Sequence, residues 1–303
     1  MHYVIGDVHG CLDEMLLLIG KIESKDPDAE FIFVGDFIDR GEQVWETYLW
    51  VKENITENGK FRSVRGNHEQ MAIDWMKDYM VWLQGKNIFG EPPYYFDFDR
   101  ALYANRNPEI IRKENFCPED FKEIMECFEA LPFDIRVPVT TKWGEEITYR
   151  IVHAGYAYGE ENQRLQHEIN IWDRTQTGNY NSPEIVVHGH TPTIDIDYIY
   201  WDQADTNPGM ISYRRNMINI DGGCVFHKVF PKYPCMLCSL CLETLEEIYP
   251  WELEDRYLYY CGDEDKDLAK AFAEKYRREY LSRSLRERER ILRRMGRPEE
   301  ENR

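Results

Sequence analysis

The chain has 303 residues, and its 43% hydrophobic and 14% aromatic content is typical of a packed globular protein rather than a disordered one. Its 56 acidic residues outnumber 37 basic ones, and the net charge of −19 disfavours general binding to nucleic acid or to a membrane surface. No apolar stretch approaches the roughly 20 residues that span a bilayer, and the N-terminus lacks the pattern of a secretory signal. We therefore predict a cytoplasmic protein whose eight cysteines are reduced thiols.

The first third of the chain alternates strand and helix patterns, each strand a short apolar run and each helix a set of apolar residues at helical spacing. The predicted strands are 3–5, 31–34 and 61–64, and the predicted helices are 12–23, 44–51 and 69–83. In the first helix the apolar stripe includes Leu12, Leu16 and Ile19. Three strand–helix units in succession indicate a parallel sheet, and the apolar run at 31–34 predicts a strand buried on both faces.

Residues 84–115 interrupt this order with glycines and prolines among tyrosines and phenylalanines. The composition predicts an irregular insert rather than a linker. Its aromatic content favours packing on another part of the molecule, where the insert could cover a site. A helix is expected again over 118–130, because Phe121, Ile124 and Phe128 fall on one helical face.

Strand patterns dominate the second half, which begins with a predicted hairpin. The predicted strands are 134–139, 146–152, 185–187, 217–220 and 237–242. Strands that follow strand–helix units favour a second sheet packed on the first, so the predicted fold class is α/β, a two-sheet αβ sandwich of strand–helix units followed by mixed strands. Beyond residue 263 the pattern is helical, and its interleaved acidic and basic residues are typical of a solvated helix face rather than a nucleic-acid-binding arm.

Five short segments share one construction, a strand pattern followed by a turn that carries glycine and residues able to bind metal. They are Gly6-Asp7-Val8-His9-Gly10, Gly35 to Gly41, Gly66-Asn67-His68-Glu69, His153-Ala154-Gly155 and His188-Gly189-His190. Each segment alone is a weak signal, because a single histidine is more often a hydrogen-bonded core residue than a ligand. Together they place histidines, aspartates and one asparagine where strands leave a sheet, which is where open α/β sheets bind ligands.

The types of residue in these turns indicate what they bind. Imidazole, carboxylate and an amide oxygen without cysteine suit manganese, iron, zinc or a related divalent ion better than a thiolate-bound structural zinc. The candidate ligands outnumber the four or so that one tetrahedral site uses, and a carboxylate can bridge, so two ions are predicted. A pair roughly 3.5–4 Å apart can activate water and clamp phosphoryl oxygens during in-line attack.

The motifs GDVHG, GDFIDRG, GNHE, HAG and HGHTP, in this order, resemble the phosphoprotein phosphatase family of calcineurin-like metallophosphoesterases. The likeness is strongest to its bacterial branch of serine/threonine protein phosphatases, which also contains the symmetrical dinucleoside tetraphosphatases, and it covers about residues 1–245. It implies a metallophosphoesterase fold with a catalytic domain over residues 1–262 that contains the insert at 84–115. Residues 263–303 are then a charged helical C-terminal extension.

The resemblance also implies a role for each matching residue. Asp7 and His9 hold the first metal, Asp36 bridges both metals, and the second metal is held by Asn67, His153 and His190. Arg40 binds the phosphate, while His68, oriented by Asp39, protonates the leaving group. These roles suit the side chains on chemical grounds, since guanidinium binds phosphate through two hydrogen bonds and histidine is the usual general acid.

The family has a second phosphate-binding arginine between the two late histidine motifs. Trp172-Asp173-Arg174 resembles the bacterial version of that segment, although Asp173 stands where an apolar residue is expected. Arg174 is therefore the candidate, with Arg164 in the same interval as the alternative.

Other notable residues have plainer interpretations. Apolar neighbours favour buried thiols over a metal cluster in the CxxCxxC run of Cys235, Cys238 and Cys241. His188 is interpreted as a structural neighbour of the site, and Asp221-Gly222-Gly223 as a turn that serves backbone geometry. Arg65 and Glu69 are expected to form ion pairs or to interact with the helix dipole.

We therefore predict a dinuclear metallophosphatase that hydrolyses phosphate monoesters by direct attack of metal-bound hydroxide. Its cofactors are two divalent ions, manganese first, with iron, zinc or a mixed pair as alternatives. The first substrate is phosphoserine or phosphothreonine in a protein, and the alternative is a dinucleoside tetraphosphate or another small phosphodiester or anhydride. A catalytically silent binding or scaffold protein is the alternative of another class. The partners are then phosphorylated proteins or small phosphate esters, without nucleic acid or membrane, and the oligomeric state stays open.

Overall fold

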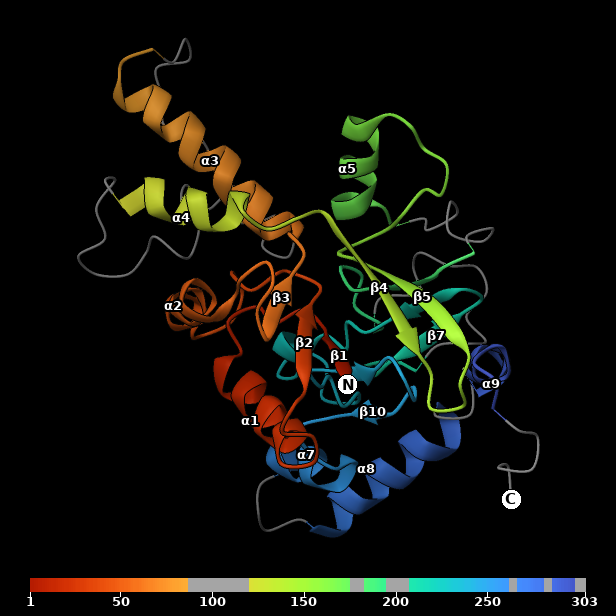
Figure 1. Cartoon of the computed structure of the whole chain (residues 1–303). Helices are drawn as coiled ribbons and strands as arrows, with labels where there is room; N and C mark the ends of the chain where they lie inside the picture. The colour runs from red at the N-terminus through yellow and green to blue at the C-terminus, as the bar shows by residue number, and fades with distance from the viewer. Residues whose placement is uncertain (87–119, 175–182, 195–206, 262–265, 281–284, 298–303) are drawn as a thin grey trace.

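The computed structural model describes residues 1–86, 120–174, 183–194, 207–261, 266–280 and 285–297 (Figure 1). One sheet contains β1 (His2–Ile5), β2 (Glu30–Phe33), β3 (Phe61–Ser63), β9 (Ser239–Cys241) and β10 (Glu247–Ile248) in the order β10-β9-β1-β2-β3. The other contains β4 (Asp134–Thr140), β5 (Glu146–Val152), β6 (Ile185–His188), β7 (Ser212–Arg214) and β8 (Met217–Asn219) in the order β4-β5-β6-β8-β7. Side chains from both sheets share one core, so the predicted two-sheet αβ sandwich is confirmed.

In the first sheet β1, β2 and β3 are parallel, as predicted, with Tyr3 opposite Phe31 and Phe31 opposite Phe61. The strand predicted at 237–242 exists as β9, but it pairs antiparallel with β1 in this sheet instead of joining the second. The reason is that β1 is buried, and only a second neighbouring strand can pair the backbone groups on its other edge. Two strands that the sequence does not predict, β7 and β10, lie at sheet edges.

The central strands place alternate side chains in two different cores. Tyr3 and Ile5 of β1 pack beneath helices, whereas Val4 between them faces the second sheet. β2 repeats this alternation, and no residue from Phe31 to Val34 is exposed. The predicted burial of that run on both faces is therefore confirmed, and it holds the turn that follows in a fixed place.

The outer face of the first sheet is covered by α1 (Leu12–Glu23), α2 (Val44–Asn54), α3 (Asn67–Leu83) and α4 (Phe121–Glu129) (Figure 1). All four lie where the sequence predicts helices. The apolar stripe of α1 differs from the prediction, because Met15, Leu18 and Ile19 are buried and Leu16 is 44% exposed. The series at spacings of three and four from Met15 is apolar throughout, so it gives the helix its buried face.

The C-terminal helices confirm the helical pattern predicted there, and they also bury apolar residues. α7 (Leu253–Cys261), which the sequence does not predict, packs with α8 (Lys266–Glu279) through Ala273 and Tyr276 of α8. α9 (Leu285–Arg294) inserts Ile291 and Leu292 into the core between the sheets. The boundary at residue 262 stays a prediction. A further helix without a predicted counterpart is α5 (Gln163–Trp172), which leads to the segment of Arg174.

The cysteines of the CxxCxxC run do not share a site. Cys241 packs beneath the helices of the first sheet, Cys238 between the sheets, and Cys235 against α7 and α8. All three are buried and outside any disulfide, which confirms the interpretation as core thiols.

The predicted insert at 84–115 lies outside the described residues, apart from its first positions at the end of α3. Over the ranges that the structure describes, no helix is both long and apolar enough to cross a membrane.

Candidate metal centre

The predicted site residues follow the carboxyl ends of strands from both sheets, and the backbone there is unusual. Several residues other than glycine have positive φ angles, a conformation that costs on the order of 1–2 kcal/mol per residue. They include His9 (44°), Asp36 (53°), Asp39 (70°), Arg40 (69°) and His190 (68°). Such a cluster of strained residues indicates a place where the positions of the side chains matter more than the cost of an unfavourable backbone conformation.

The turns after β1 and β2 are tied together by their backbones. The N–H groups of His9 and Gly10 donate to the carbonyl oxygens of Asp36 and Phe37, each at 2.8 Å. Gly41 permits this contact, because a Cβ at that position would lie 2.0 Å from the His9 carbonyl oxygen. The two turns therefore form one rigid base for the side chains above them.

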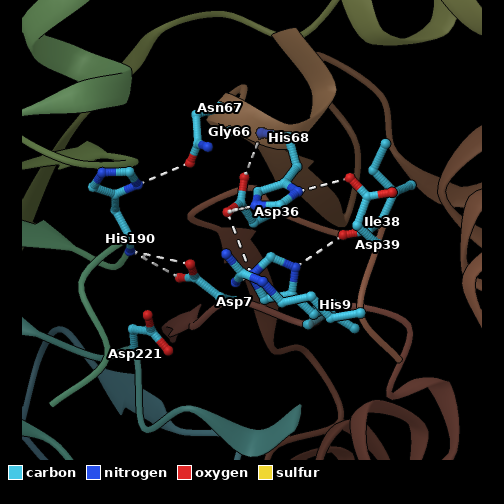
Figure 2. A network of polar contacts seen from close by, with 12 residues as sticks. Asp7, His9, Asp36, Ile38, Asp39, Gly66, Asn67, His68, His190 and Asp221 are labelled. Atoms are coloured by element: carbon cyan, nitrogen blue, oxygen red, sulfur yellow. Dashed lines mark hydrogen bonds and ion pairs between the residues drawn. The ribbon is translucent and has the colours of Figure 1, made fainter. Parts of the chain in front are cut away.

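Asp36 lies at the centre of the buried side chains (Figure 2). Its Oδ1 accepts the backbone N–H of His68 at 3.0 Å, which leaves Oδ2 to face the imidazoles. Oδ2 lies 3.4 Å from Nε2 of His9 and 3.4 Å from Nε2 of His153. Two buried groups able to hold a metal ion result, His9-Asp36-His68 and Asp36-His153-His190, and both include Asp36.

Asn67 completes the second group. Its Oδ1 lies 2.7 Å from Nε2 of His153 and 2.8 Å from Nδ1 of His190, and these two ring nitrogens are 3.1 Å apart. Three atoms with lone pairs therefore surround one point. A cation at that point would satisfy all of them at once.

Hydrogen bonds to backbone carbonyl oxygens orient two of the imidazoles. Nδ1 of His9 lies 2.9 Å from the carbonyl oxygen of Ile38, and Nδ1 of His153 lies 2.8 Å from that of Val34. A carbonyl oxygen can only accept, so Nδ1 carries the proton and Nε2 of the neutral ring turns its lone pair toward Asp36. This second contact is the usual support of a metal-binding histidine.

Asp7 and His68 are placed differently from what the resemblance implies. The carboxylate of Asp7 accepts the backbone N–H of His190 at 3.0 Å, and Asp7 belongs to neither donor group among the described residues (Figure 2). His68, expected as the general acid, belongs to the first group. Its Nδ1 lies 2.7 Å from Oδ2 of Asp39, the contact that the predicted support by Asp39 requires.

The site contains buried carboxyl groups beside neutral imidazoles, an arrangement that favours the binding of cations. Burial, with the neighbouring carboxylates of Asp221 and Asp36, raises the pKa of Asp7 well above its ordinary value, and burial raises the pKa of Asp36 to about 7. Burial also lowers the pKa of His153 to about 3, so its ring is neutral. Buried carboxylates among neutral imidazoles are costly unless a positive ion joins them. The donor set thus fits two divalent ions.

Arg40 and Arg174 bring positive charge to the site, and both lie close enough to lower the pKa of Asp36 against the effect of burial. Nη1 of Arg40 is in close contact with Nε2 of His9, and its guanidinium lies 5.5 Å from the centre of the Phe226 ring. Nη1 of Arg174 donates to Oγ1 of Thr191 at 3.4 Å, next to His190. Arg164 is exposed on α5, whereas Arg174 is partly buried.

Two neighbours of the site behave as the sequence predicts. His188 is buried outside both donor groups, with Nδ1 3.1 Å from the Gly189 carbonyl oxygen. Asp221 serves the turn, because its Oδ1 accepts the N–H of Gly223, whose φ is 68°. The sequence does not predict that the charge of Asp221 also raises the pKa of Asp7.

Of the two interactions expected for Arg65 and Glu69, the one with the helix dipole is confirmed for Glu69, which lies in the first turn of α3. The contacts described for the two residues are hydrogen bonds and a ring contact rather than ion pairs. Arg65 donates to Oε1 of Gln70 and to the carbonyl oxygen of Glu129, and it lies 4.5 Å from the centre of the Phe133 ring. Glu69 accepts hydrogen bonds from backbone N–H groups of two loops. Its place in the first turn of α3, three residues after Gly66, is typical of a residue that caps a helix.

Two donor groups that share a carboxylate, with arginines beside them at the end of an αβ sandwich, define a metallophosphoesterase. The chain belongs to the calcineurin-like phosphoesterase family, whose model matches residues 3–217. It is therefore a phosphatase of a family that uses divalent metals.

Relatives within the family bear two kinds of name. An asymmetrical bis(5'-nucleosyl)-tetraphosphatase, PrpE of Bacillus velezensis, is 40% identical over 240 residues, which cover 74% of this chain and 84% of that protein. Serine/threonine-protein phosphatase 2 of Salmonella typhimurium is 26% identical over 175 residues, 57% of this chain and 67% of that protein. A Caenorhabditis elegans relative is 34% identical over 121 residues, which are 35% of this chain and 26% of its own length.

Proposed function

We propose that this phosphatase is a two-metal enzyme in which Asp36 bridges the ions. The observation that carries the proposal is the single Oδ2 atom of Asp36, which faces His9 and His153, one residue of each donor group. His9 with Asp7 would hold one ion, and Asn67 with His153 and His190 the other. Asp7 would have to turn part of its carboxylate from the His190 N–H toward that ion.

Bound divalent ions supply an activated water and neutralise the charge on phosphoryl oxygens. The protein's own residues would do the rest. Arg40 and Arg174 bind the remaining phosphoryl oxygens and hold the phosphorus in line. His68 in its doubly protonated form would give the proton on Nε2 to the leaving oxygen, while its Nδ1–H donates to Asp39, whose carboxylate stabilises that form and keeps the ring in place.

The proposed ions are manganese first, with iron, zinc or a mixed pair as alternatives. The donor set combines imidazole, carboxylate and amide oxygen, and no cysteine of the described residues belongs to it. A cytoplasmic location and the absence of nucleic-acid and membrane partners remain part of the proposal.

For the substrate we propose a dinucleoside tetraphosphate, the runner-up from sequence alone. The B. velezensis relative, whose name states this activity, resembles the chain over 84% of its own length. Phosphoserine or phosphothreonine in a protein, the first expectation from sequence, is the second candidate. The S. typhimurium relative, matched over 67% of its length, supports it.

A side-by-side assay tests both substrates. The purified full chain, loaded with Mn²⁺, is given diadenosine tetraphosphate and a phosphoserine peptide, and kcat/KM is compared for the two. Asp36→Asn prepared in the same way is the control for a contaminating phosphatase. We expect a higher value for the dinucleotide, with ATP and AMP as the products of asymmetrical cleavage or two ADP of symmetrical cleavage.

A higher value for the peptide would reverse the order of the two substrates. Failure to hydrolyse either compound or an aryl phosphate with Mn²⁺, Fe²⁺ or Zn²⁺ would contradict the proposed two-metal enzyme and favour a binding protein.

A further inference from the structure

The carboxylate of Glu69 is fully buried and joins two loops of the metal centre. Glu69 lies in the first turn of α3, and its Oε2 accepts the N–H of Asp36 at 2.9 Å and the N–H of Gly66 at 3.0 Å. Its Oε1 accepts the N–H of Phe37 at 2.8 Å. One side chain therefore fixes the loop after β2 and the loop after β3 to each other.

These N–H groups need such a partner. β2 ends at Phe33, so the amides of Asp36 and Phe37 lie past the last pair of the ladder. Asp36 also has a φ of 53°, which is unfavourable for a residue other than glycine. A buried carboxylate that accepts hydrogen bonds from both amides can offset that cost, since unpaired buried N–H groups are strongly disfavoured.

The loops meet more closely than most side chains would allow. A Cβ at Gly66 would lie 2.1 Å from Oδ1 of Asp36 and 2.6 Å from Oε2 of Glu69. Figure 2 shows Gly66 beside Asp36. The close approach brings the start of α3 against Asp36, where the N–H of His68 reaches its Oδ1.

The start of α3 thus holds Asp36 in two ways. Glu69 fixes its backbone, and the His68 N–H fixes Oδ1 of its carboxylate. Together they determine where Oδ2 points, 3.4 Å from Nε2 of both His9 and His153. Glu69 itself belongs to neither donor group.

We propose that Glu69 is a positioning residue for Asp36 and that its carboxylate sets the affinity of the centre for divalent ions. This inference rests on the proposed two-metal function. Glutamine is the informative substitute, because it has nearly the same shape and only one acceptor oxygen. Its NH₂ group would face a backbone N–H, so at least one of the hydrogen bonds would be replaced by a repulsive contact.

The test compares Mn²⁺ binding by the metal-free full chain and by Glu69→Gln, followed by electron paramagnetic resonance of the free ion. Glu14→Gln is the matched control. Glu14 is also a buried helical glutamate that accepts a backbone N–H, from Leu237 at 2.7 Å, and it lies outside both donor groups. We expect about 10–100-fold weaker Mn²⁺ binding for Glu69→Gln and wild-type affinity for Glu14→Gln.

The possible results distinguish a failure of the role proposed for Glu69 from a failure of the proposed two-metal function. Wild-type Mn²⁺ affinity in a folded Glu69→Gln, whatever its melting temperature, would reduce Glu69 to a structural role and overturn the proposal. No Mn²⁺ binding by the wild-type protein would instead overturn the proposed metal centre, and the inference with it.

Amide exchange of the wild-type protein covers the case in which Glu69→Gln does not fold. We expect slow hydrogen exchange at the amides of Asp36, Phe37 and Gly66, because the carboxylate accepts from all three. Exchange at these amides as fast as in exposed loops would overturn the proposal without any substitution.

Discussion

The loops of the metal centre and the C-terminal helices differ in how well their sequences indicate their roles. The loops are short, and their buried polar residues, such as Asp36 and His153, are unusual enough to reveal a site. In α9 a highly charged surface accompanies Ile291 and Leu292, which are 3% exposed in the core between the sheets. A functional site can be recognised in sequence because polar residues are unusual in turns that follow buried strands. The buried face of a structural helix is harder to recognise when most of its residues are charged and face the solvent.

Polar contacts also anchor α9. Oγ1 of Thr141 donates to the carbonyl oxygen of Met295 at 2.9 Å, and the N–H of Arg215 donates to Oε2 of Glu287 at 2.9 Å. These contacts attach the helix to the second sheet on both sides. If the contrast is correct, substitutions in the loops remove activity with little loss of stability, and those in the helices do the reverse.

The largest effect is expected for His68→Asn. Loss of the proton donor should lower kcat/KM for a substrate with a poor leaving group by about 10²–10⁴-fold, while the Mn²⁺ content stays that of the wild-type protein. Metal analysis beside steady-state kinetics measures both. Loss of Mn²⁺ from the variant would instead make His68 a ligand, as its place in the first donor group allows.

Leu292→Ala tests the other region. Removing a buried side chain from the core between the sheets should lower the free energy of unfolding by about 2–5 kcal/mol, with kcat preserved in the folded fraction. Urea unfolding measures the change. Arg290→Ala on the exposed side of the same helix, where the side chain is 68% exposed, is the control and should be nearly neutral. Equal effects of the two substitutions would show that α9 is not part of the core in solution.

The burial of Glu14 predicts a pH dependence of stability, although Arg256 of α7, 3.7 Å from Oε2 of Glu14, partly opposes the effect. Burial raises the pKa of Glu14 from 4.5 to about 7. The folded protein then binds this proton more tightly than the unfolded chain, so the stability it contributes is complete below pH 4.5 and is lost as the pH rises to 7.

Relative to Glu14→Gln, the wild-type protein should therefore lose roughly 3 kcal/mol of unfolding free energy over that range. The variant keeps an acceptor for the N–H of Leu237. Urea unfolding at a series of pH values measures the difference, and parallel profiles of the two proteins would contradict it.

The smallest effect is expected for Arg174→Ala. Loss of one charged hydrogen bond to the phosphate should cost about 2 kcal/mol in kcat/KM, or about 30-fold. Arg164→Ala, at an exposed position on α5, is the matched control. Unchanged kinetics for Arg174→Ala would remove it from the site, and an effect confined to Arg164→Ala would make that residue the second phosphate ligand.

The local sequence pattern was enough to predict the motif loops and the strands that lead into them. Burial of a strand and the chemistry of a turn depend mainly on residues that are adjacent in sequence. The direction of each loop side chain was not predictable. Asp7 faces the N–H of His190, and His68 lies nearer to His9 and Asp36 than its expected role suggests. The residues that they face, His190, His9 and Asp36, have positive φ angles, which sequence pattern does not specify for residues other than glycine.

Long-range pairing was the other part that the sequence left open. β9 looks like any apolar strand, and only the unpaired edge of β1 assigns it to the first sheet. The role of Glu69 was missed for a similar reason. Its position three residues after Gly66 signals a helix cap, but its bonds to Asp36 and Phe37 depend on a loop about 30 residues earlier in the chain.

The pairing of β1 with β9 has a consequence for synthesis of the protein. Tyr3 is made long before its partner Cys241, and Met295 of the shared core is made later still. At a synthesis rate of roughly 5–20 residues per second, the residues of β9 are made on the order of 10–50 s after those of β1. During that interval the nascent chain presents the open edge of β1 to chaperones, and the core between the sheets cannot be completed until Met295 has been made.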